Sequence, residues 1–96
     1  MKLEWSVFAL ADRNGIFDFI EADSPRSAIK VDSAIEAQAE RLVDFPESGR
    51  PGRITGTREV VVAQLPYVIA YRVTSDQVRI LRVLHGAQQW PDSLPQ

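Results

Sequence analysis

The side chains of this chain that could recognise a charged ligand are concentrated in its second half, and most of them are arginines. Residues 49–90 hold six arginines and no lysine, namely Arg50, Arg53, Arg58, Arg72, Arg79 and Arg82. A guanidinium presents a planar fork of donors that matches a carboxylate or a phosphate. The pattern therefore favours a partner that is either an acidic protein segment or a nucleic-acid backbone. The competing interpretation is an arginine-rich sheet face that contacts only water.

The distribution of charge supports an anionic partner. Residues 1–48 carry ten acidic and five basic side chains, whereas residues 49–90 carry only Glu59 and Asp76 against the six arginines. The net charge of −2 conceals this asymmetry. A basic second half indicates a surface that meets something anionic.

Several classes of site are excluded by composition. The chain has no cysteine and a single histidine, His85, so disulfides, thiolate metal sites and histidine-based metal sites are excluded, and we expect no metal and no cofactor. The N-terminus lacks the apolar stretch of a signal peptide, and no apolar run approaches the roughly 20 residues of a membrane helix. We therefore expect a cytoplasmic protein that does not contact a membrane.

Two helices are predicted after a short first strand. Residues 2–7 alternate between apolar and polar, as a strand does. Over residues 8–23, Ala9, Ile16 and Ile20 fall on one helical face with Phe19 beside them, and Asp12, Arg13 and Asp18 are free to face water. Ser24 and Pro25 indicate a new helix, since serine caps and proline suits the first turn. That second helix should bury Ala28, Ile35, Ala39 and Leu42, with Glu36 and Glu40 outside the stripe, and should end before Pro46.

The rest of the chain is predicted to be a loop followed by a sheet. Residues 47–56 contain three glycines and a proline, which predicts a loop with no regular element. Residues 57–63, 67–73 and 78–85 should be strands joined by short connections, and therefore an antiparallel meander. The predicted fold is α+β, in the order β-α-α-β-β-β, with a helical hairpin packed on one face of a small, mainly antiparallel sheet. Residues 1–90 form one domain, and residues 91–96 a flexible tail.

The last strand is apolar on both sides, which predicts an apolar outer face on the sheet. By alternation, Arg79, Leu81, Val83 and His85 share one side, and Val78, Ile80, Arg82 and Leu84 share the other. An apolar patch ringed with charge marks a partner site. The alternative is that the residues after the last strand, Trp90 among them, fold back and cover this patch.

Four segments together resemble the RelE/ParE toxin superfamily of type II toxin–antitoxin modules. They are residues 45–53 (FPESGRPGR), 56–60 (GTREV), 66–73 (PYVIAYRV) and 78–86 (VRILRVLHG), and the likeness extends over nearly the whole chain. The resemblance implies the same β-α-α-β-β-β fold. It also implies a growth-inhibiting toxin, such as those that stabilise plasmids, which a cognate antitoxin neutralises with its C-terminal segment and which meets operator DNA only through that antitoxin.

Two activities occur in this superfamily, and the sequence favours one of them. RelE-like members cut messenger RNA on the ribosome, and ParE-like members poison DNA gyrase. RelE-like sequences typically carry an arginine where this chain has Val68, and many end in a basic or aromatic tail where it has an uncharged stretch, residues 86–90. Both departures favour gyrase poisoning by protein contact, without catalysis, over a ribosome-dependent endoribonuclease. A third hypothesis is a binding domain that has lost toxicity.

The site residues follow from these hypotheses. For a nuclease, Arg58, Arg72 and Arg82 would hold phosphate, Glu59 or Tyr71 would act as base, and His85 as acid. For a contact toxin, the surface for the antitoxin or the target would include Arg53, Arg58, Arg72, Arg82, His85 and Trp90. His85 is more often structural than catalytic at a strand end, and Trp90 could instead cover the sheet.

Overall fold

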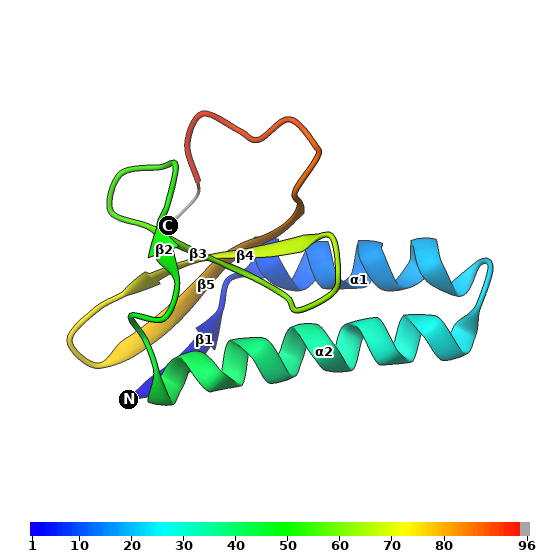
Figure 1. Cartoon of the computed structure of the whole chain (residues 1–96), viewed down its shortest axis with the longest axis horizontal. Coiled ribbons are helices and arrows are strands. Elements are labelled where there is room, and N and C mark those ends of the chain that lie inside the picture. Colours follow the sequence, from blue (N-terminus) through cyan, green and yellow to red (C-terminus); the bar gives the residue numbers. More distant parts are fainter. Residues whose placement is uncertain (95–96) are drawn as a thin grey trace.

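The computed structural model describes residues 1–94, and residues 95–96 lie outside the described part. Its elements are β1 (Lys2–Trp5), α1 (Val7–Glu21), α2 (Pro25–Asp44), β2 (Arg50–Pro51), β3 (Arg58–Val61), β4 (Tyr67–Val73) and β5 (Gln77–His85). One five-stranded sheet has the order β1-β5-β4-β3-β2, in which β1 is parallel to β5 and every other pair is antiparallel. The two helices lie side by side against the sheet, and the segment after β5 is on the opposite side (Figure 1). The predicted α+β fold is confirmed.

Serine caps begin both helices. Ser6 has extended backbone angles and its hydroxyl accepts a hydrogen bond from the Ala9 amide, 3.0 Å away, so it ends β1 and starts α1. Ser24 accepts from the Ser27 amide in the same manner, and Pro25 occupies the first position of α2. Each cap supplies an acceptor to an amide that the first helical turn would leave unpaired.

The α2 stripe packs as its spacing predicted. Ala28, Ile35, Ala39 and Leu42 are all fully buried. Ile35, Ala39 and Leu42 join Ile69, Tyr71, Ile80 and Val83 of the sheet in the main core. The hairpin therefore covers one sheet face, called here the inner face, and the opposite face is called the outer face.

Helix α1 packs less completely than its sequence predicted. Ala9 is buried and Ile16 packs against the core, but Phe19 is 78% exposed instead of lying beside them. Arg13 does not simply face water: its guanidinium reaches Asp32 of α2 at 2.8 and 3.0 Å and lies 4.6 Å from the Trp5 ring. These contacts hold α1 against α2 and β1.

A β-bulge corrects the predicted faces of β5. Ala70 of β4 is opposite Arg82, whereas the next residue, Tyr71, is opposite Ile80, so Leu81 is an extra residue. Beyond such an extra residue the alternation of side chains changes phase. Leu81 consequently packs on the outer face, and Val83 packs in the inner core, although simple alternation placed them together.

The predicted loop contains a short strand. Arg50 and Pro51 pair with Glu59 and Arg58, respectively, and form the edge strand β2. Proline has no backbone N–H to donate. It is tolerated in an edge strand because such a strand has a neighbouring strand on one side only. No helix within residues 1–94 is long and apolar enough to cross a membrane.

Candidate functional site

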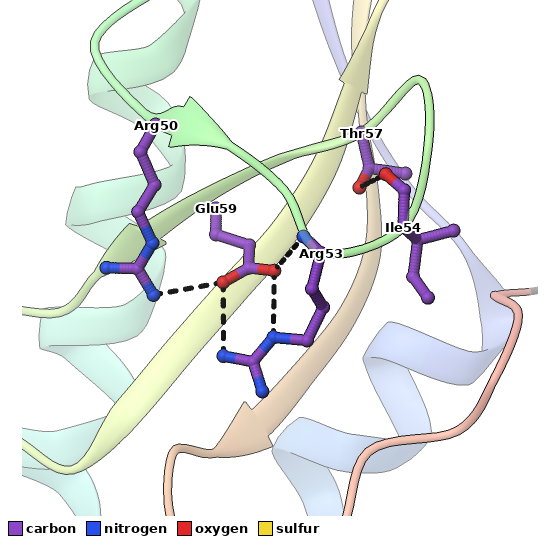
Figure 2. Close-up of polar contacts among 5 residues, drawn as sticks. All are labelled: Arg50, Arg53, Ile54, Thr57 and Glu59. Carbon is purple, nitrogen blue, oxygen red and sulfur yellow. Dashed lines mark hydrogen bonds and ion pairs between the residues drawn. The ribbon is translucent and has the colours of Figure 1, made fainter.

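Glu59 is the centre of an ion-pair cluster under the loop between β2 and β3 (Figure 2). Its carboxylate accepts a hydrogen bond from Arg50 Nη2 at 3.0 Å. It also accepts the Arg53 backbone amide at 2.8 Å, Arg53 Nε at 3.1 Å and Arg53 Nη2 at 3.3 Å. The Glu59 side chain is 2% exposed, whereas both arginines remain about half exposed. One buried carboxylate thus fixes the loop to β3.

The pKa of Glu59 lies below its ordinary value. Burial alone would raise it, but the hydrogen bonds from the Arg53 amide and guanidinium and from Arg50 outweigh burial and lower the pKa. A carboxylate stabilised in this way is a weak base and has no free face for a substrate. Its position argues against the catalytic base that the nuclease hypothesis assigned to Glu59.

Trp90 links this cluster to the segment after β5. The Arg53 guanidinium stacks on the Trp90 ring at 3.6 Å from the ring centre. Beneath them, Ala70, Leu81 and Leu94 form a small outer core to which Ile54 and Trp90 also contribute. The alternative in which residues after the last strand, Trp90 among them, cover the outer face is therefore confirmed for Trp90 and Leu94.

The packing of Trp90 and Leu94 on the outer face contradicts two predictions made from the sequence. The apolar strip over Ala70 and Leu81 is covered and is not an open partner site. Leu94 is only 5% exposed and packs in the outer core, whereas Asp92 and Ser93 are exposed, so the terminal segment that was predicted to be flexible is held to the sheet at Leu94. Residues 95–96 lie outside the described part of the chain.

Tyr71 and Arg58 stabilise the turn after α2. The Tyr71 hydroxyl donates to the Pro46 carbonyl at 2.8 Å and accepts from the Gly49 amide at 2.9 Å. Arg58 donates to the Gly49 carbonyl at 2.8 Å. Burial is the main cause that raises the pKa of Tyr71. A buried phenol with both hydrogen-bonding positions occupied is a structural group, and not the base of the nuclease hypothesis.

Gly49 permits that arrangement. A Cβ at Gly49 would lie 2.5 Å from the Tyr71 hydroxyl and 2.7 Å from the Glu59 carbonyl oxygen. Both distances are too short for any side chain, so only glycine lets the turn approach β3 and β4 so closely.

Arg82 forms an ion pair with Asp12 of α1. Its Nε and Nη2 donate to the two Asp12 oxygens at 2.7 and 2.9 Å, and the Val83 amide donates to the same carboxylate at 2.9 Å. The hydrogen bond with Asp12 is the main cause that raises the pKa of Arg82. Arg82 is therefore committed to an internal partner, which sequence reasoning did not anticipate because Asp12 was assigned to water.

His85 lies at the end of β5 beside a groove. Its Nδ1 accepts a hydrogen bond from the Ala87 amide at 3.0 Å, and its ring meets Tyr67 edge-on at 5.7 Å between centres. The groove, called here the α1–β5 groove, has a volume of about 360 Å³. Its lining includes Ala11, Gly15, Ile16, Phe19, Tyr67, Arg82, Val83 and His85.

Arg72 differs from the other arginines of the sheet. Its Nε is buried and has no hydrogen-bond partner. Its cross-strand neighbour is Arg79, which is itself paired with Glu4. A Cβ at Gly56 would be 3.3 Å from Arg72 Nη2, so the guanidinium packs closely against that turn. Arg72 and Arg79 occupy directly opposite positions, where like charges repel each other. A bound anion would reduce this repulsion.

The candidate residues are therefore divided among four places. Arg82 and His85 line the α1–β5 groove, and Arg53, Glu59 and Trp90 form the outer cluster. Arg58, the first residue of β3, pairs with Tyr71, and Arg72 packs against the turn at Gly56. Asp12 and Gln88, which were not among the candidates, take part in the groove. Their role depends on how α1 docks on β5, for which the sequence offers no signal.

Comparisons with known proteins agree with this architecture. Residues 3–90 match the family described as the ParE toxin of the type II toxin–antitoxin system parDE. A protein of Sinorhizobium fredii named as a candidate toxin is 44% identical over 97% of this chain and 96% of its own length. Toxin RelE2 of Caulobacter vibrioides is 39% identical over 91% of this chain and 97% of its own.

A solved structure shares the fold. A chain of the chromosomal ParDE toxin–antitoxin system from P. aeruginosa superimposes with a TM-score of 0.79 at 30% identity. The match covers 88% of this chain and 95% of that one.

Proposed function

Because this chain belongs to the ParE toxin family and is a toxin of a type II toxin–antitoxin system, we propose that it stops growth by binding a protein target, DNA gyrase. In this proposal the chain makes and breaks no bonds. A cognate antitoxin neutralises it in the cytoplasm, and operator DNA meets it only through that antitoxin.

The observation that carries the choice of mechanism is the commitment of the catalytic candidates to internal partners. Glu59 accepts hydrogen bonds from two arginines, and the Tyr71 hydroxyl has both a donor and an acceptor. Arg82 is held by Asp12. A nuclease needs a base, an acid and phosphate donors that converge on one reacting atom. Groups divided among separate places and already bonded do not fit that requirement, and this supports a contact mechanism.

Ribosome-dependent cleavage of messenger RNA is the second candidate. Arg82, His85 and Tyr67 line one groove, which is the closest approach to a nuclease site in residues 1–94. Two relatives from Caulobacter vibrioides are also named RelE toxins. For this candidate, His85 would be the acid, and Arg82 would have to exchange Asp12 for a phosphate.

The antitoxin surface follows from the charges that remain unbalanced on the outer face. Glu59 is shared by two arginines, and the buried Nε of Arg72 has no hydrogen-bond partner. An antitoxin segment with acidic side chains would supply the missing carboxylates there, and opposite charges also raise the association rate. Arg53, Arg72 and Trp90 are the side chains we place in this contact.

Two assays on the purified chain test the target. We expect the chain to inhibit supercoiling by gyrase and to leave message in programmed ribosomes intact. The antitoxin, added in equal amount, should restore supercoiling. Cleavage of message in the ribosomal A site, without any effect on gyrase, would overturn the proposal and establish the second candidate.

A further inference from the structure

Helix α1 has an apolar face that the rest of the chain does not cover. Its exposed side chains include four large apolar ones, Val7, Phe8, Leu10 and Phe19, of which Val7 and Phe19 are more than 70% exposed. A surface helix ordinarily turns its large apolar side chains toward the core, but Val7, Phe8 and Phe19 on one side of α1 remain in solvent. The uncovered face therefore indicates an interaction surface.

Gly15 at the middle of this face has no role within the monomer. A Cβ added there meets no atom within 4 Å, so no internal contact requires the absence of a side chain. Glycine weakens a helix relative to alanine. Val7, Ala11, Gly15 and Phe19 follow one another at four-residue spacing and so form one stripe along the helix. Small residues at the centre of such a stripe allow a second helix to come close.

The α1–β5 groove beside Gly15 is suited to side chains from a helix and not to an added strand. Three backbone groups on the edge of β5 that faces the groove already have side-chain partners. Ser6 Oγ donates to the Leu81 carbonyl at 2.8 Å, Asp12 accepts the Val83 amide, and Gln88 Oε1 accepts the His85 amide at 2.8 Å. A helix needs none of these groups, because its backbone hydrogen bonds are internal.

Helix α1 has a projecting apolar turn at its start and lies beside the α1–β5 groove further along. The apolar first turn, with Val7 and Phe8, projects into solvent, and the groove lies beside Gly15, about 12 Å further along at 1.5 Å per residue. We propose that two copies of this chain pack α1 against α1 in antiparallel orientation about a two-fold axis. Each copy then inserts its first turn into the groove of the other, which is a self-complementary interface.

The charges of α1 favour a second copy over another occupant. The first turn has no acidic residue and the last turn has no basic one, while Asp18 and Glu21 lie near the C-terminal end. In a lone helix this arrangement opposes the macrodipole, whose N-terminal end is positive and whose C-terminal end is negative. An antiparallel copy brings the acidic end of each helix next to the positive end of the other. This inference does not depend on the choice between gyrase and ribosome.

Sedimentation equilibrium of the purified chain, without antitoxin, is the primary test. The mass should rise with concentration from 10.8 kDa to twice that value. Gly15→Leu should weaken self-association at least tenfold, because the new side chain fills the space that the second helix needs. At a protein concentration where the unmodified chain is monomeric, the same substitution should maintain or raise the melting temperature, since the position is open and leucine favours a helix. Ile29→Asp on α2 is the control, as Ile29 is exposed outside the α1 stripe and should leave the dimer intact.

Reversal of the charges at the C-terminal end of α1 is an independent test of the dimer. Asp18→Lys combined with Glu21→Lys improves the helix end in a monomer but places positive charge next to the positive end of the other copy. We expect a more stable monomer and a dimer weakened at least tenfold. A chain that stays monomeric at every concentration, or a dimer unaffected by Gly15→Leu, overturns the inference. Loss of antitoxin binding in Gly15→Leu, for a chain that is monomeric throughout, would assign this face to the antitoxin instead.

Discussion

Asp12 of α1 and Arg82 of β5 join the helical hairpin to an edge of the sheet that has no neighbouring strand. The pairing of β1 with β5 ends at Ile80, and beyond it the Asp12 carboxylate takes the place of a strand. It accepts both Arg82 donors, at 2.7 and 2.9 Å, together with the Val83 amide. Because the carboxylate compensates both a charge and a backbone donor, we regard this pair as the structural connection between α1 and β5.

Asp12→Ala should therefore destabilise the chain. Three hydrogen bonds are lost and Arg82 is left without its counterion, for which we expect a loss of about 2–4 kcal/mol in the free energy of unfolding. Urea denaturation provides the measurement. Glu40→Ala on α2 is the control, since Glu40 is exposed and lies outside the buried stripe, and it should change stability by no more than about 0.5 kcal/mol. Equal, small losses for both variants would show that the Asp12–Arg82 pair does not form in solution.

The elements that sequence alone predicted are those with a strong local periodicity. The stripe of α2 follows from the geometry of a helix, in which residues three and four apart share a face. Its four members, Ala28, Ile35, Ala39 and Leu42, are the ones that the structure buries. The serine and proline at the start of α2, and the proline after its end, predict the bounds of this helix without information from the rest of the chain.

Leu42→Ala measures the contribution of that stripe. Leu42 is fully buried in the main core, so the substitution should lower the free energy of unfolding by about 2–5 kcal/mol through lost contacts and a cavity. Glu36→Ala on the same helix should cost under about 0.5 kcal/mol, because its contact with Arg13 is long, at 3.5 Å, and exposed. Similar costs for the two substitutions would mean that the helix phase differs from the one described here.

What the sequence could not predict depends on register and on contacts between distant residues. A single extra residue at Leu81 changes the phase of β5, and no local pattern marks it. Likewise, the arginines could be identified as a group, but their partners could not, because Asp12 is 70 residues from Arg82 in the chain. The sequence left open whether Trp90 covers the outer face, and it did not predict the contact of Trp90 with Arg53.

Glu59 should make stability depend on pH in the acid range. Its pKa in the folded chain is below the ordinary value of 4.5, because the bonds from Arg53 and Arg50 outweigh the effect of burial. A depressed folded-state pKa contributes stability that is present above the unfolded pKa and is lost as the pH falls through the folded pKa. We expect unfolding free energy to decline below about pH 4.5. In Glu59→Gln this decline should be smaller. The substitution should also lower the free energy of unfolding by about 1–3 kcal/mol at neutral pH. An identical acid profile in the two proteins would contradict this role.

Arg72→Glu should weaken binding of the antitoxin. Arg72 has a buried Nε without an acceptor and faces another arginine across the strands, so a partner carboxylate is the group it lacks. Reversal of the charge should cost about 2 kcal/mol or more in the free energy of binding, measured by calorimetry. Arg26→Glu on α2, which is exposed and distant from the outer face, is the matched reversal and should leave affinity unchanged. Unchanged affinity in Arg72→Glu would remove Arg72 from the interface.

His85→Gln distinguishes the two proposed mechanisms. A nuclease that loses its general acid is slowed by about a hundredfold or more, because proton transfer contributes that much to the rate. In a contact toxin the same change removes only the bond from the Ala87 amide and the ring contact with Tyr67, both at the surface end of β5. We therefore expect His85→Gln to inhibit growth as the unmodified chain does, when it is expressed without antitoxin. Thermal denaturation of both proteins should confirm that the variant is folded. The opposite result would be a folded His85→Gln variant that no longer arrests growth, while only the unmodified chain cuts message. That result would establish cleavage in place of gyrase poisoning.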